Sequence, residues 1–93
     1  MTINQKQRLR IKRKMAEEKP SIWIGKNGVT EDIIKEISKQ LERDQVVKIK
    51  VLKSIMKTNS ISNLAIELAI RTDSILIEVR GYSLILYRMK KRD

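Results

Sequence analysis

The spacing of apolar residues changes several times along this chain, and each change marks a predicted element. Isoleucine and leucine at positions 33, 34, 37 and 41 repeat with helical spacing, which predicts a helix over residues 31–43 with Thr30 as its N-cap. From Val47 to Val51 apolar residues alternate with lysines. This alternation predicts a strand over residues 46–51 with one apolar and one basic face.

Weaker patterns complete the fold. They predict a helix over 3–18 that ends before Pro20, a strand over 21–24, a helix from Asn59 or Ser60 to about Thr72, and strands over 74–80 and 83–89. Gly81-Tyr82 between the last two strands suits a type II′ hairpin. The order α-β-α-β-α-β-β, with a right-handed crossover between the first two strands, predicts one α/β (α+β) domain over residues 1–93. Its four-stranded sheet is mixed, with helices packed on it.

Composition narrows the chemistry available to such a domain. The chain has 93 residues, 41% of them hydrophobic, and contains neither His nor Cys. It therefore lacks the residues of the usual zinc sites, of disulfides and of Ser-His-Asp or Cys-His catalysis. The neighbouring carboxylates are best explained by helix capping and solubility. We expect no enzyme activity, no metal, no cofactor and no small-molecule substrate.

The net charge of +10 is concentrated at the two ends of the chain. Residues 1–20 hold seven Lys/Arg against two Asp/Glu, and residues 80–93 hold five against one. Basic ends on a nearly neutral middle favour a polyanion as partner, nucleic acid first and an anionic membrane second. No apolar run approaches the roughly 20 residues of a membrane span, and the start lacks a signal-peptide core. We therefore expect a cytoplasmic protein with no membrane partner.

The loop Gly25-Lys26-Asn27-Gly28 joins the first predicted strand to the clearest predicted helix. Its glycines permit close backbone approach, and Lys26 adds positive charge, a combination that suits a nucleic-acid backbone, as in the GXXG loop of KH domains. The same four residues also suit a plain strand-to-helix turn. Glu31 and Asp32 would repel a phosphate on the helix axis, so we expect any phosphate beside the loop, against Lys26.

Two longer segments resemble one protein family. Residues 19–30, KPSIWIGKNGVT, resemble the signature of the CRM (chloroplast RNA splicing and ribosome maturation) domain, and residues 77–88, IEVRGYSLILYR, resemble its closing hairpin. The resemblance covers about residues 8–90. It implies a fold similar to the C-terminal domain of translation initiation factor three, and it implies RNA binding. Stand-alone prokaryotic members are linked to large-ribosomal-subunit precursors, and plant members to organellar intron splicing.

The predicted RNA-binding residues come from the first helix, the loop and the closing hairpin. They are Arg8, Arg10, Lys12, Arg13, Lys14, Gly25, Lys26, Asn27, Gly28, Arg80, Tyr82 and Arg88. We expect the first helix and the loop to form one continuous basic surface. The alternative for the helix is a solvated tail. The basic tail over 90–93 is either functional or disordered, and Lys48 and Lys50 either line an exposed sheet face or keep it soluble. Trp23 alternates opposite to Ile22 and Ile24, so it either lies under the first helix or stacks a base, and we expect it to pack in the core.

These observations favour a monomeric RNA-binding protein that binds ribosomal RNA during large-subunit assembly or assists RNA folding. One alternative is a dimeric Alba-like protein that coats DNA or RNA. Another is a protein-interaction subunit whose basic ends are incidental. With only three aromatic residues, an aromatic sheet platform of the RRM type is not expected to be the main source of affinity.

Overall fold

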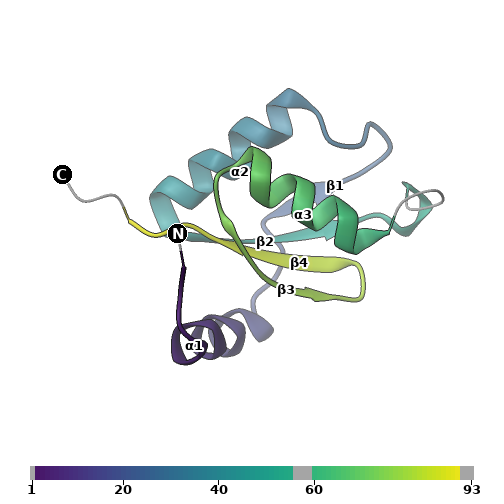
Figure 1. The fold of residues 1–93 in the computed structure, drawn as a ribbon. Helices are drawn as coiled ribbons and strands as arrows, with labels where there is room; N and C mark the ends of the chain where they lie inside the picture. The colour runs from purple at the N-terminus through teal and green to yellow at the C-terminus, as the bar shows by residue number, and fades with distance from the viewer. Residues whose placement is uncertain (1, 56–59, 91–93) are drawn as a thin grey trace.

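The computed structural model describes residues 2–55 and 60–90 and arranges them in three layers (Figure 1). A four-stranded sheet has α1 on one face and α2 and α3 on the other. The elements are α1 Gln5–Ala16, β1 Ile22–Ile24, α2 Glu31–Asp44, β2 Val46–Val51, a short 3-10 helix η1 Lys53–Ile55, α3 Ile61–Arg71, β3 Ile75–Arg80 and β4 Ser83–Tyr87. The predicted element order is confirmed. The alternative cap Asn59 and residues 91–93 of the basic tail lie outside the described residues.

The sheet has the order β1-β2-β4-β3 and is mixed, as predicted. β1 pairs with β2 in parallel, and β4 pairs antiparallel with both β2 and β3. Gly81 has φ +61, the positive value that the first residue of a type II′ turn requires. The ends of β1 and β2 and the hairpin tip meet at one end of the sheet, since Leu52 N donates to Ile24 O over 2.9 Å and Val51 N donates to Tyr82 O over 2.8 Å.

Side-chain caps fix where the helices begin. The Thr30 hydroxyl accepts from Ile33 N, as predicted, and the Ser60 hydroxyl accepts from Asn63 N. The first helix was predicted from residue 3 but begins at Gln5. Asn4 and Gln7 form a capping box there, in which each side chain accepts from the other residue's backbone N–H.

The main core lies between the sheet and the pair α2 and α3. Its fully buried side chains come from alternate positions of the strands and from one stripe of each helix: Ile24, Val47, Ile49, Val51, Leu84, Leu86, Ile37, Leu41 and Leu68. The apolar side chains of β2 therefore face the main core, as the sequence predicted, and its lysines lie on the opposite face of the sheet. Burial of this apolar surface is the main term that stabilises the fold.

A second, smaller cluster holds α1 against the other face of the sheet. Met15, Ile77 and Ile85 are buried there, with Ile11 packed beside them, while Leu9 on a neighbouring helix face is 47% exposed. The Lys48 ammonium donates to the carbonyls of Met15 and Glu18, at 3.0 and 2.9 Å. Met15 O also accepts from Glu18 N, so the Lys48 cation adds a second donor at the end of the helix and complements the helix dipole.

Candidate nucleic-acid interface

The Gly25–Gly28 loop is a closed turn whose polar side chains face solvent. Gly28 N donates to Gly25 O over 2.8 Å, and Lys26 and Asn27 between them are exposed. The two glycines have different roles. Gly28 has φ +66, which side chains rarely adopt, whereas an added Cβ at Gly25 would meet Leu52 Cδ1 at 3.4 Å. The conformation therefore demands glycine at position 28 more strongly than at position 25.

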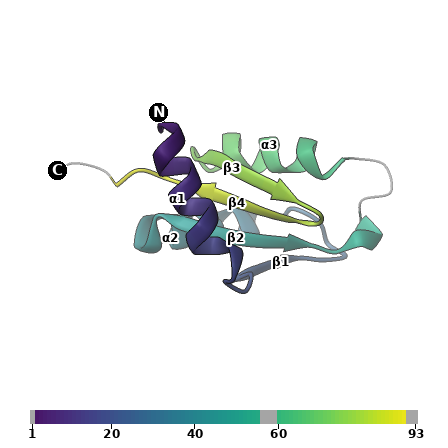
Figure 2. The same cartoon turned by 90° about the horizontal axis from the view of Figure 1, so that it is seen from below.

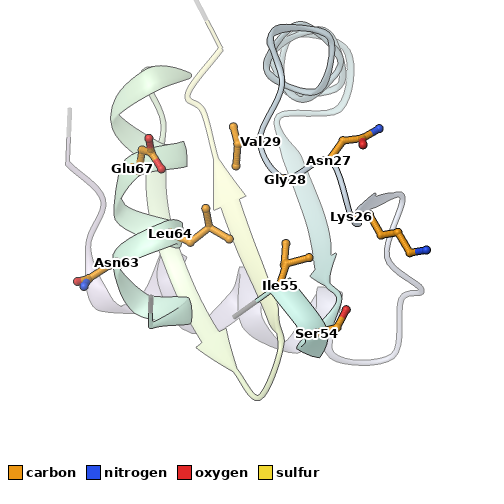
Figure 3. Close-up of a pocket in the computed structure, with 9 residues that line it drawn as sticks. All are labelled: Lys26, Asn27, Gly28, Val29, Ser54, Ile55, Asn63, Leu64 and Glu67. Carbon is orange, nitrogen blue, oxygen red and sulfur yellow. The ribbon is translucent and has the colours of Figure 1, made fainter. Parts of the chain in front are cut away.

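A groove of about 930 Å³ lies between the loop, η1 and α3 (Figure 3). Val29, Ile55 and Leu64 point into its centre, whereas Lys26 and Asn27 extend outward from the loop. Lys26 and Glu67 are the charged residues of the lining, and their charges cancel. The Lys26 ammonium extends away from the centre of the groove (Figure 3), so the positive charge of the loop faces outward.

The loop and the first helix do not form one basic surface, contrary to the sequence-based expectation. The loop borders the groove on the α3 side of the sheet, whereas α1 lies on the opposite face (Figure 1). That expectation rested on the short path from Pro20 to Gly25, which limits separation along the strand but does not fix the face of the sheet on which α1 packs.

The predicted basic residues of α1 have different surroundings. Arg10, Arg13 and Lys14 are exposed, and Lys12 is half-buried. Arg8 instead faces the sheet, where its Nη1 donates to the carbonyls of Leu76 and Ile77, both at 2.9 Å. The β-bulge between Leu76 and Glu78 lies at this point of the edge strand β3. Arg8 thus has a structural role in holding α1 to the sheet, and the exposed bases are the ones free to contact a polyanion.

Arg88 also has a structural role. Its guanidinium donates to the Ser38 backbone and side-chain oxygens and to Thr72 O, so it joins the end of β4 to α2 and α3. Its Nε is buried without a hydrogen-bond partner. Arg88 was predicted to bind RNA as part of the closing hairpin, but its guanidinium is engaged in the junction of three elements, and this geometry does not suit contact with RNA.

Trp23 is exposed, and the expectation that it packs in the core is wrong. Its relative exposure is 58%, and its ring lies 5.9 Å from Lys50 Nζ, measured to the ring centroid. Ile22 and Ile24 face the main core, so Trp23 faces the side of α1. α1 crosses the strands, and the ends of β2 and of the hairpin extend beyond it (Figure 2), so the helix leaves Trp23 uncovered. In the sequence Trp23 lies between two isoleucines of the strand, and this alternation predicts that it faces away from them. The alternation does not predict that the ring is exposed.

A row of side chains across the sheet escaped the sequence analysis. Trp23 pairs with Lys50, Lys50 with Ser83, and Ser83 with Arg80, so the four residues lie side by side on the face that carries α1. Three of them, Trp23, Lys50 and Ser83, are not among the predicted site residues. Their alignment depends on the register of three strand pairs, and sequence patterns leave that register open.

Tyr82 is 37% exposed at the hairpin tip, beside the exposed Arg80. Because Tyr82 O accepts from Val51 N, the tip is fixed to the end of β2. Arg80 and Tyr82 therefore lie at the same end of the sheet as the loop that carries Lys26 and Asn27, but Arg80 belongs to the opposite edge strand.

Other chemistry finds little support in the described ranges 2–55 and 60–90. No group of three or more acidic, His or Cys side chains there is arranged to hold a metal ion. No helix within those ranges is both long and apolar enough to cross a membrane.

Comparisons with known proteins bear on the family and the fold of this chain. The model of the CRS1/YhbY (CRM) domain matches residues 3–88. A protein of Methanocaldococcus jannaschii is named a probable RNA-binding protein. It is 31% identical to this chain over an aligned length of 97, and the alignment covers 98% of this chain and 72% of the relative. The solution structure of a hypothetical Staphylococcus aureus protein, proposed to bind RNA, matches with a TM-score of 0.78 and 29% identity over 99% of this chain and 94% of that one.

Proposed function

This chain belongs to the CRS1/YhbY (CRM) domain family, and from that membership we propose that it binds RNA. The family match over nearly the whole chain is the observation that carries the proposal. The names of the two relatives support it, since both refer to RNA binding. The match also favours this function over the Alba-like alternative.

The surface charge supports a polyanionic partner. The exposed bases of α1 lie on one face of the sheet, and Lys26 and Arg80 are exposed at the sheet end. Contacts from Lys and Arg to phosphates release condensed counterions and provide affinity without sequence specificity. We therefore propose a sequence-tolerant contact in which the Gly25–Gly28 loop holds one phosphate against Lys26.

We further propose that the RNA is ribosomal and that the protein acts in the cytoplasm on precursors of the large subunit, or assists RNA folding. The resemblance of residues 19–30 and 77–88 to stand-alone prokaryotic members supports this role. Sequencing of RNA cross-linked to the protein in its native cell tests it, and we expect enrichment of large-subunit ribosomal RNA. A cross-linked population without that enrichment would reject the ribosomal role and leave RNA binding intact.

A salt titration tests RNA binding itself. If six phosphates are contacted, a plot of log affinity against log salt should have a slope of about −4 to −5, at about −0.7 to −0.9 per contact. Anisotropy of a dye-labelled RNA measures the affinity at each salt concentration. A slope near zero, or no binding at low salt, would reject the electrostatic account.

A further inference from the structure

We propose that the part of the sheet left uncovered by α1 is a site for unpaired RNA, in which a base stacks on Trp23 and flanking phosphates pair with Lys50 and Arg80. This inference rests on the proposed RNA binding and deepens it, because it names the form of RNA and a second contact surface. It places this contact on the opposite face of the sheet from the groove beside the Gly25–Gly28 loop.

The site exists because α1 covers only part of its face of the sheet. The helix packs on the cluster that contains Ile75, Ile77, Ile85 and Tyr87, and Figure 2 shows the ends of β2 and of the hairpin extending beyond it. Next to α1 the surface is hollowed, with Ala16 on the helix side and Arg80 among the lining residues on the sheet side. An extended chain can therefore lie on the sheet with α1 as a wall.

The row Trp23, Lys50, Ser83 and Arg80 forms the floor of this site. Neighbouring strands are about 4.8 Å apart, so three strand spacings place the backbones of Trp23 and Arg80 about 14 Å apart. An aromatic ring thus lies at one end of the row, a guanidinium at the other, and an ammonium and a hydroxyl between them. These groups match the base, phosphate and sugar of a nucleic-acid strand.

Trp23 is the residue that points to a stacked base. A tryptophan usually buries its ring, yet this one is 58% exposed on the edge strand β1. The Lys50 ammonium, 5.9 Å from the ring centroid, adds a cation beside the ring. A base that stacks on the exposed ring therefore brings its phosphate close to a positive charge.

The charge of the surrounding face favours an anionic strand and limits its path. Among the described strand residues of this face, Lys48, Lys50 and Arg80 lie against one carboxylate, Glu78, which pairs in register with Ile85. Glu17 and Glu18 follow the end of α1 on the same side. The Lys48 ammonium already binds the end of α1. The phosphates are therefore expected along Lys50 and Arg80, one row away from Glu78.

The stacking requirement selects unpaired RNA over a duplex. Bases inside an A-form helix are stacked on each other and do not offer a free π-face, whereas unpaired bases can be splayed onto an aromatic side chain. Every base has such a face, so the contact tolerates sequence changes.

The test uses the full chain and its single tryptophan, whose fluorescence reports on this site alone. The probes are a dye-labelled 12-nucleotide oligouridine and an RNA duplex of the same length, each also followed by anisotropy. We expect oligouridine to quench Trp23 fluorescence along the same curve as its anisotropy, and the duplex to leave the fluorescence unchanged at saturation.

Two variants at Trp23 and one control separate stacking from folding. Trp23→Leu should weaken oligouridine binding about 5- to 150-fold, and Trp23→Phe should retain most of the affinity because it keeps an aromatic face. Ile70→Ala removes an apolar side chain that is 74% exposed on α3 and should change nothing. All three variants should melt within a few degrees of the parent.

The outcomes distinguish this inference from the proposed function. Oligouridine binding that leaves Trp23 fluorescence and the Trp23→Leu affinity unchanged would overturn the sheet-face site but keep RNA binding. Equal quenching by the duplex would overturn the selection for unpaired RNA. No binding of either RNA at low salt would reject both proposals and favour a protein partner for the exposed ring.

Discussion

At the residue scale, the backbone of the Gly25–Gly28 loop requires glycine more strictly at position 28 than at position 25. Gly28 has φ +66, whereas an added Cβ at Gly25 meets only Leu52 Cδ1, at the 3.4 Å boundary of ordinary contact. We expect Gly28→Ala to lower the free energy of unfolding by about 1 kcal/mol, since alanine is strained at positive φ. Gly25→Ala should cost less, and urea unfolding of both variants measures the difference. Equal costs would mean that the strain at position 28 is relieved by a change of turn.

The charge of the same loop can be changed without touching either glycine. Lys26 and Asn27 are exposed, so Lys26→Ala with Asn27→Asp should keep the melting temperature within a few degrees. Loss of one phosphate contact should make the salt slope of RNA binding shallower by about 0.7–0.9. If melting and slope both stay as in the parent, the loop is only a turn, and the affinity must come from the other basic residues.

Two residues show the limit of sequence reasoning at this scale. The alternation gave the face of Trp23 correctly, yet its exposure depends on where along the strands α1 crosses the sheet. Arg88 was predicted to contact RNA, but it donates to Ser38 and Thr72, residues far away in the sequence. Both outcomes depend on packing between distant elements, and local patterns do not contain that information.

At the element scale, α2 and β2 were predicted almost to the residue, and α1 was not. The helical spacing of apolar residues in α2 and their alternation with lysines in β2 each predict which face of the element is buried. In α1 the pairs Leu9 with Ala16 and Ile11 with Met15 offered two faces, and the second one docks. Hydrogen bonds of Arg8 to β3 and of Lys48 to the end of α1 hold the helix in this orientation. Both donors are polar residues, so a hydrophobic pattern gives no information about them.

The exposed side of α1 gives a test of its role in binding. Arg10 and Arg13 are exposed and no described contact depends on them, whereas Arg8 anchors the helix. Arg10→Glu with Arg13→Glu should therefore weaken RNA binding and leave the unfolding midpoint near that of the parent. Anisotropy measures the affinity, and thermal unfolding checks the fold.

Arg8→Ala is the matched control for this pair. It removes a charge-assisted contact to two carbonyls and should lower the free energy of unfolding by about 1.5–3 kcal/mol. If the double charge reversal leaves the affinity unchanged, the bases of α1 are a solvated surface and not part of the interface.

At the scale of the whole molecule, the features that determine self-association favour a monomer. A sheet edge invites pairing with a second copy, but β1 has three residues and β3 carries a bulge whose neighbouring carbonyls already accept from Arg8. The net charge of +10 also makes two copies repel each other. Ile66 and Ile70 are exposed one turn apart on α3, which is a small apolar area for an interface.

We therefore expect a monomer of 10.9 kDa in solution, with a Cα radius of gyration near 12.7 Å. Light scattering after size exclusion measures the mass, and small-angle X-ray scattering measures the size. The mass should be the same at low and high salt, because repulsion is screened by salt but no specific interface replaces it. A doubled mass that Ile70→Lys returns to the monomer value would place an interface on α3. A doubled mass that survives this substitution would instead assign pairing to a sheet edge and revive the dimeric architectural alternative.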